Sequence, residues 1–169
     1  MAVVIAISMH ARNIAIVAVA ASAFLSQLSC DRVRKAAARA NTVNEIERLH
    51  GCISDRTTDD GVPIEVFLST VGNPVLLNDD ELLRLGPQLR AFEGTEYLDL
   101  SNIPVTDKGL AGVEGWDSLT AINLANTRVS FAGLVSLRKS LPRLKTLYLE
   151  GVKLNAADLA HIREEVEVK

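Results

Sequence analysis

The chain has 169 residues, a formal net charge of −3 at pH 7, and two cysteines. This length is enough for one domain, and two cysteines do not make a disulfide framework. The slight acidic excess provides no basic field for nucleic acid, and the four phenylalanines are scattered rather than grouped on a platform. The composition therefore predicts a domain that does not bind nucleic acid.

Residues 1–30 contain no acidic residue and a single arginine, Arg12. Ile14 to Leu25 is a nearly unbroken apolar run of 12 residues, which suits the core of a signal peptide and is shorter than a spanning helix. Ala21-Ser22-Ala23 offers a small-residue cleavage site. An uncleaved anchor is the alternative, because Ile14 to Cys30 reaches 17 residues, the lower limit of a span.

The charges around this segment bear on its topology. Four basic residues follow it closely, against one before it: Arg32, Arg34, Lys35 and Arg39. Basic residues prefer the cytoplasmic side, so an uncleaved anchor would leave the rest of the chain inside the cell. Three interpretations stay open: a cleaved signal peptide, a membrane anchor and a buried helix of a soluble protein. The first two predict contact with the membrane or export to the cell envelope.

Residues 31–51 have the pattern of an amphipathic helix that ends at Gly51. One face carries the apolar residues at steps of three and four: Val33, Ala36, Ala40, Val43, Ile46 and Leu49. The helix is either a basic stalk on anionic lipid or a solvated helix packed on the following domain. Glu45 and Glu47 dilute its positive charge and favour the second interpretation.

Residues 52–90 begin with a polar loop and contain half of a structural repeat. Val62 to Leu68 is either a short strand or a short helix. Asn78 and Glu81 predict a capping box, in which each side chain bonds the backbone N–H of the other residue. Leu82, Leu85 and Leu89 continue that helix. Because no strand is recognisable just before Asn78, we interpret this segment as an atypical N-terminal cap.

Residues 91–169 contain the same pattern three times. Alternating apolar residues predict a short strand in each copy: Leu98-Asp99-Leu100, Ile122-Asn123-Leu124 and Leu147-Tyr148-Leu149. A helix-capping residue follows each strand, namely Thr106, Ser130 and Asn155. The strand leucines Leu100, Leu124 and Leu149 are 24 and 25 residues apart, a spacing typical of stacked repeats.

The step Thr106-Asp107-Lys108-Gly109-Leu110 resembles the leucine-rich repeat in its bacterial variant. The second copy keeps Gly133-Leu134 but has Phe131 in place of the acid, and the third copy lacks the glycine. With its apolar N-terminus and basic helix, the chain is similar to short membrane-anchored bacterial leucine-rich-repeat proteins. The resemblance implies an α/β solenoid, with short parallel strands on a concave face and helices on a convex face.

The end of the chain predicts one further strand. Val166 and Val168 alternate with charged residues, and the period of the repeats places a fourth strand here. Charged side chains on a short edge strand discourage pairing with another chain. We therefore expect residues 166–169 to close the stack as an edge strand.

No motif in the sequence supplies catalytic chemistry. There is no phosphate-binding loop, nucleophile elbow or metal-spaced pair of histidines or cysteines, so we expect a protein that is not an enzyme and has no metal or cofactor. Asp59-Asp60 is interpreted as a turn, and Asp79-Asp80-Glu81 as a helix start, rather than as cation sites. Trp116 is expected to pack between a helix and the next strand.

Leucine-rich-repeat proteins often bind protein partners on the concave face, and the resemblance implies the same surface here. The candidate residues are the outward strand positions and their neighbours: Tyr97, Asp99, Ser101, Asn123, Tyr148 and Glu150. We expect a non-catalytic protein-interaction module, held at the membrane or exported. The alternative is a cytoplasmic recognition subunit of the ubiquitin-ligase substrate-receptor type. That alternative needs an adaptor-docking helix near the N-terminus, where residues 1–30 are too apolar.

Overall fold

The computed structural model describes residues 34–49, 51–54, 65–68, 77–90, 92, 94–164 and 166–169. The predicted signal peptide or anchor, Asp59-Asp60 and the part of the proposed polar loop after Ser54 lie outside these residues. The chain divides into two units, residues 1–38 and residues 39–169, and the sheet belongs to the second. None of the helices in the described ranges is both long and apolar enough to cross a membrane.

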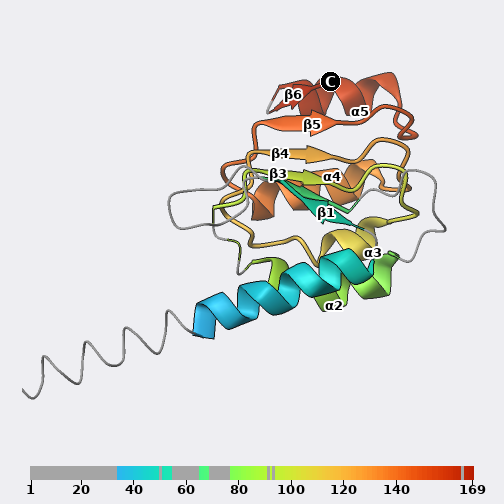
Figure 1. Cartoon of the computed structure of the whole chain (residues 1–169). Helices are drawn as coiled ribbons and strands as arrows, with labels where there is room; N and C mark the ends of the chain where they lie inside the picture. The colour runs from blue at the N-terminus through green and yellow to red at the C-terminus, as the bar shows by residue number, and fades with distance from the viewer. Residues whose placement is uncertain are drawn as a thin grey trace, which may run out of the picture. The chain divides into compact units, whose positions relative to one another are not determined.

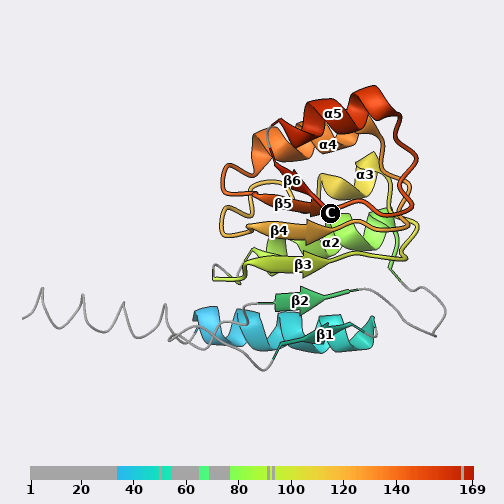
Figure 2. The same cartoon turned by 90° about the horizontal axis from the view of Figure 1, so that it is seen from above.

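The second unit has the α/β class predicted from the sequence. A helix spans residues 34–48, and the following elements are β1 (Cys52–Ile53), β2 (Glu65–Phe67), α2 (Asp79–Leu89), β3 (Tyr97–Asp99), α3 (Asp107–Leu110), β4 (Ala121–Asn123), α4 (Phe131–Ser140), β5 (Thr146–Tyr148), α5 (Ala156–Arg163) and β6 (Glu167–Val168). The strands form one sheet in chain order, with β1 antiparallel to β2 and all later pairs parallel (Figures 1 and 2).

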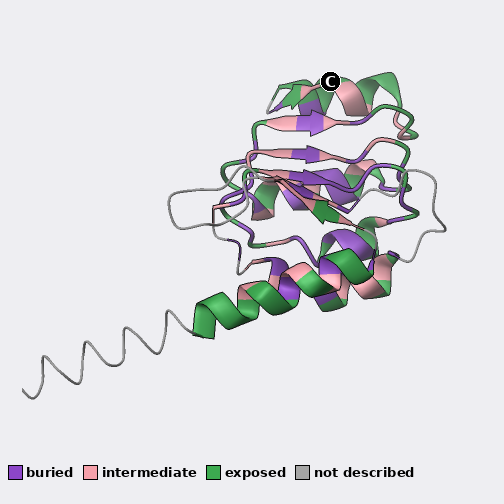
Figure 3. Cartoon of the chain, viewed as in Figure 1, coloured by how far each residue is buried: buried purple, intermediate pink, exposed green. Residues whose placement is uncertain are grey.

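The register of the sheet aligns equivalent residues of successive strands. Leu98 pairs with Ile122, which pairs with Leu147, and all three side chains are fully buried. Their strand neighbours are mostly half-buried, so the middle of β4 and of β5 is purple between pink ends in Figure 3. This alternation gives the sheet one face in the hydrophobic core and one open face.

The strand β2 supplies the half repeat that the sequence pattern concealed. Val66 pairs with Leu98, and both Val66 and Leu68 are buried like Leu98 and Leu100. Nine residues separate Leu68 from the helix cap Asn78, whereas five separate Leu100 from Thr106. This longer connection breaks the period, so the sequence leaves Val62 to Leu68 as either a strand or a helix and does not align it with the repeats. The structure has the strand, at Glu65–Phe67. The two-residue strand β1 is not predicted by the sequence.

The part of the helix over residues 34–48 that belongs to the second unit, residues 39–48, packs on the domain, which favours the second interpretation of this segment. Ile46 and Leu49 are almost completely buried, and the buried Thr42 hydroxyl lies 3.5 Å from the Gln88 carbonyl in α2. Ala40 is exposed, so the buried stripe within the second unit is shorter than the sequence predicted. It comprises the last two turns of the helix.

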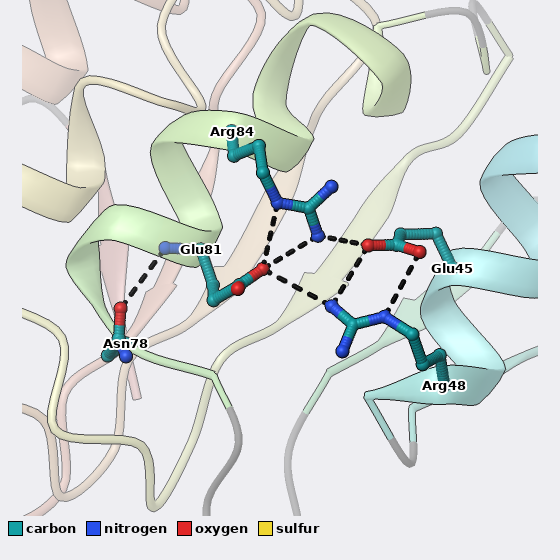
Figure 4. A network of polar contacts seen from close by, with 5 residues as sticks. All are labelled: Glu45, Arg48, Asn78, Glu81 and Arg84. Carbon is teal, nitrogen blue, oxygen red and sulfur yellow. Dashed lines mark hydrogen bonds and ion pairs between the residues drawn. The ribbon is translucent and has the colours of Figure 1, made fainter.

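Ion pairs between this helix and α2 form a network at the surface (Figure 4). Arg48 lies 3.0 Å from Glu45 and 3.4 Å from Glu81, and Arg84 contacts both carboxylates. Hydrogen bonds from Arg48 and Arg84 lower the pKa of Glu45 to about 2. The Glu81 carboxylate is thus engaged by arginines, and the predicted capping box is wrong in that half. The other half is present, because Asn78 Oδ1 accepts from Glu81 N at 3.1 Å.

A carboxylate links each of two successive helix starts to the next. Asp79 in α2 accepts from the backbone N and the hydroxyl of Thr106, the N-cap of α3, at 2.8 and 2.6 Å. Asp107 in α3 accepts in the same way from Ser130, the N-cap of α4, at 2.7 and 2.5 Å. We call these two pairs the acid clasps. Each satisfies a donor that the helix itself leaves free.

The acid clasps explain the glycines of the repeated motif. A Cβ on Gly109 would collide with the Asp79 carboxylate, and a Cβ on Gly133 would collide with the Asp107 carboxylate. The third repeat has neither the preceding acid nor the glycine, because Phe131 stands in place of the acid. There Asp158 occupies the glycine position, and Asn155 and Asp158 form a capping box of their own, with bonds of 3.2 and 2.8 Å.

Two further expectations concern packing. Trp116 is 2% exposed and donates its Nε1–H to the Phe92 carbonyl at 3.0 Å, which confirms that it packs inside the domain. At the other end of the sheet, β6 pairs in parallel with β5, and Lys169 N donates to the Leu147 carbonyl at 3.0 Å. Val166 is buried while Glu167 and Lys169 are exposed, as expected for a charged edge strand.

Candidate functional site

The open face of the sheet gathers side chains from five strands into one row. The register places Phe67, Asp99, Asn123 and Tyr148 at equivalent positions of β2, β3, β4 and β5, and Lys169 follows β6 next to Tyr148. Because alternate residues of a strand point to the same face, Tyr97 shares this face with Asp99. Along each strand, the residues of the open face therefore alternate with the residues that form the core.

On the open face, the Tyr97 ring from β3 contacts the Phe67 ring from β2 and the Tyr148 ring from β5. The Phe67 and Tyr97 ring centroids are 5.7 Å apart, and the Tyr97 and Tyr148 centroids are 6.2 Å apart in an edge-to-face arrangement. The intervening strand β4 carries the small Ala121 in register with Tyr97. All three aromatic side chains are half-buried, so each has a packed side and an accessible side. We call Phe67, Tyr97 and Tyr148 the aromatic cluster.

Polar groups beside the aromatic cluster fix its position. The Tyr97 hydroxyl and the Asn123 amide each lie 3.4 Å from Asp99 Oδ2. Burial, together with the Asp99 carboxylate, raises the pKa of Tyr97 to about 12, so its hydroxyl keeps its proton at neutral pH. At the other end, Lys169 Nζ lies 5.8 Å from the centre of the Tyr148 ring, within reach of a cation–π interaction.

Asp99 and Asn123 also perform the same local task in successive repeats. Asp99 Oδ1 accepts from Ser101 N at 2.8 Å, and Asn123 Oδ1 accepts from Ala125 N at 3.0 Å. Such bonds from a side chain to the N–H two residues later hold a turn. One oxygen of each side chain is therefore engaged by the fold, which is a structural reason for Asp or Asn at these positions.

The six candidate residues thus fall into two groups. Tyr97, Asp99, Asn123 and Tyr148 are brought together by the contacts just described. Ser101 is 7% exposed and Asp99 is 9% exposed, so the expectation that both present accessible side chains is wrong: the turn after β3 buries them. Glu150 is exposed, but it lies in the turn after β5, next to Gly151.

Sequence reasoning missed two residues of the open face, Phe67 and Lys169. Phe67 precedes Leu68 as Asp99 precedes Leu100, but the irregular spacing of the first repeat hid this equivalence. Lys169 follows from the predicted terminal strand, once that strand is aligned with β5. Alignment of the strands rather than of the motifs would have found both.

The acidic residues at the start of α2 each contact another residue of this chain, in agreement with their interpretation as a helix start. Asp79 holds Thr106, Asp80 lies 2.6 Å from Lys108 Nζ, and Glu81 pairs with arginines. In the described part of the chain, no group of three or more His, Cys, Asp or Glu residues is arranged to hold a metal ion. Cys52 is an exposed free thiol.

Comparison with known proteins finds similarity among solved structures. No protein-family model and no curated protein matches the chain. Among solved structures, the chain is similar to "Leiomodin-1 Actin-Binding Site 2 (ABS2)", with 14% sequence identity and a TM-score of 0.49. The match covers 60% of this chain and 62% of that one. A similarity of this degree carries no functional conclusion.

Proposed function

We propose that the chain is a non-catalytic protein-interaction module, built as a leucine-rich-repeat solenoid, whose partner docks on the open face. The aromatic cluster carries this proposal. Tyrosine supplies a large contact area with few rotatable bonds, and aromatic side chains are enriched at protein interfaces. The three rings already support one another through the edge-to-face and tilted contacts, so little conformational entropy remains to be lost on binding.

The solenoid part of the proposal rests on the repetition of local chemistry. Equivalent strands pair in register, equivalent N-caps start the helices, and equivalent residues lie at positive φ in the turns: Asn102, Asn126 and Gly151. The Asn126 amide donates to Asn102 Oδ1 at 3.0 Å, so the turns contact one another too. Neighbouring units that supply each other's missing surface are the defining property of repeat proteins.

Site-specific photo-cross-linking in cells tests the binding surface. A photoreactive residue at Asn123 lies on the open face, and one at Ala132, an exposed residue of α4, is the matched control. We expect a discrete adduct from Asn123 and none of equal yield from Ala132. A partner captured by Asn123 is then purified, and its affinity should fall about tenfold or more for Tyr148→Ala. Adducts from Ala132 alone would contradict the proposal.

We further propose that the module is held at the membrane or exported by its apolar N-terminal segment. The support is the composition of residues 1–30, which suits either a signal peptide or an anchor. Detergent fractionation combined with N-terminal sequencing of the mature protein distinguishes the two. An intact N-terminus in the membrane fraction indicates an anchor, and cleavage near Ala23 indicates export. A full-length protein in the aqueous fraction would contradict both.

A further inference from the structure

Two adjoining hollows lie at the C-terminal end of the second unit, away from the aromatic cluster. The smaller, with a volume of about 200 Å³, lies between α4 and α5 and is lined by Val135, Arg138, Lys139, Leu147, His161, Ile162 and Val166. The larger, of about 590 Å³, is an open depression lined by the loops before β5 and β6. We call them the apolar cavity and the basic depression. Arg138 and Val166 line both, so the hollows are contiguous.

Four of the seven described residues that line the apolar cavity are aliphatic. Leu147 is fully buried, Ile162 and Val166 are each 6% exposed, and the half-buried Val135 completes the wall. A wholly apolar cavity of about 150 Å³ accepts a ring the size of benzene, which sets the scale for this one. The space between α4 and α5 therefore fits an apolar group of about six carbons. Among the described residues that line it, the ionisable ones are Arg138, Lys139 and His161.

The basic depression adds positive charge at the mouth of this cavity. Of the described lining residues, Arg138, Arg143, Lys145 and Arg163 are basic, and Glu164 and Glu167 are acidic. Glu167 is itself engaged, because it lies 3.4 Å from Lys169 Nζ and accepts from the Thr146 hydroxyl at 3.4 Å. Among the residues that the structure describes, Arg143, Lys145 and Arg163 make no ion pair. Since the whole chain has a net charge of −3, this excess of cations is local.

From this arrangement we propose that the apolar cavity and the basic depression form one binding site for a small carboxylate with an apolar tail, such as a free medium-chain fatty acid. The tail enters between α4 and α5 past Val135 and Ile162. The carboxylate stays in the depression, where Arg143 and Arg163 are the available cations. A carboxylate is favoured because guanidinium groups bind it through paired hydrogen bonds. This site is separate from the open face and does not depend on the proposed function.

The direct test is calorimetric titration of the full-length protein with octanoate. We expect saturable binding at one site, with millimolar affinity or better. Uncharged 1-octanol should bind about tenfold more weakly because it lacks the charge, and acetate should not bind because it lacks the tail. The absence of saturable octanoate binding overturns the proposal. A tripeptide ending in leucine that binds tenfold more tightly than octanoate also overturns it, in favour of a polypeptide C-terminus.

Variants locate the site. Arg143→Glu and Arg163→Glu should each weaken octanoate binding about tenfold, whereas Arg128→Glu, the same change at an exposed residue outside both hollows, should leave it unchanged. Val135→Phe fills the cavity and should abolish binding. If the Val135→Phe protein does not fold, the milder Val135→Leu takes its place and should weaken binding. Equal loss from Arg128→Glu, or unchanged binding in a folded Val135 variant, overturns the proposal.

Discussion

The junctions between successive helices are built in two ways. Between α2 and α3, and between α3 and α4, an acid clasp joins one helix start to the next, and a glycine makes room for it. Between α4 and α5, Phe131 replaces the acid and Asp158 replaces the glycine. Asn155 and Asp158 form a capping box within the third repeat instead. The acid of one repeat and the glycine of the next thus act as a single device, and both are absent together.

The two kinds of junction also differ in packing. A Cβ on Gly86 of α2 would collide with the backbone of Gly112, just after α3, so these backbones are in close contact. Between α4 and α5 lies the apolar cavity of about 200 Å³, and Ile162 is the one buried residue of α5. The clasped junction between α2 and α3 is therefore tight, and the unclasped junction between α4 and α5 leaves space that a ligand can use.

The largest expected effect on the free energy of unfolding distinguishes the middle repeat from the third repeat. Leu124 is fully buried in the middle repeat, whereas Leu149, its equivalent in the third, is 6% exposed. Leu124→Ala should lower the free energy of unfolding by about 2–5 kcal/mol, through lost burial and a residual cavity. Leu149→Ala should lower it less. Denaturant unfolding of both variants tests this order, and a Leu124→Ala protein as stable as the parent would refute the assigned core.

The acid clasps come next in size. Asp79→Ala removes two hydrogen bonds to a charged acceptor from Thr106 and should lower the unfolding free energy by about 1.5–3 kcal/mol. Asp107→Ala should have a smaller effect. Asp107 is exposed whereas Asp79 is half-buried, so water replaces the hydrogen bonds of Asp107 more readily. If both variants unfold like the parent in chemical denaturation, the clasps do not stabilise the junctions.

The capping box of the third repeat should contribute less to the free energy of unfolding. Asp158→Ala removes the carboxylate that accepts from Asn155 N at 3.2 Å, in an exposed capping box. The loss should be about 1 kcal/mol, the usual effect of a helix cap. Thermal unfolding gives the size, with Ala157→Ser at the adjacent exposed position as the control. A larger loss than for Asp79→Ala would reverse the comparison between the two kinds of junction.

The smallest effect concerns the exposed network of Glu45, Arg48, Glu81 and Arg84. The arginines lower the pKa of Glu45 from 4.5 to about 2 in the folded protein. The ionised form is therefore favoured by folding, and its contribution is present above pH 4.5 and is lost as the pH falls toward 2. Glu45→Gln should slightly lower Tm at pH 7 in low salt, and the difference should vanish near pH 2. A difference that grows on acidification would be inconsistent with these ion pairs.

The periodic part of the fold was predictable from sequence because each strand there carries an alternating pair such as Leu98 and Leu100. The α/β class, the caps at Thr106, Ser130 and Asn155, and the strand β6 followed from that regularity. The strand β2 was one of two alternatives for Val62 to Leu68, and its alignment with the repeats did not follow, because a longer connection shifts Val66 out of the period. For the candidate site, the sequence identified Tyr97 and Tyr148. It did not reveal that Asp99 and Ser101 are buried by a turn, because hydrogen bonds of the folded backbone decide that.

The exchange of acid and glycine is tested most directly by a double-mutant cycle of Asp107→Ala and Gly133→Ala, followed by denaturant unfolding. With Asp107 present, the added Cβ at residue 133 collides with its carboxylate, and Gly133→Ala should destabilise the protein. With Ala at residue 107 that collision is gone. Gly133→Ala should then be neutral or stabilise by up to about 1 kcal/mol, because alanine favours a helix over glycine. Equal effects of Gly133→Ala in the two backgrounds would contradict a shared role for the acid and the glycine.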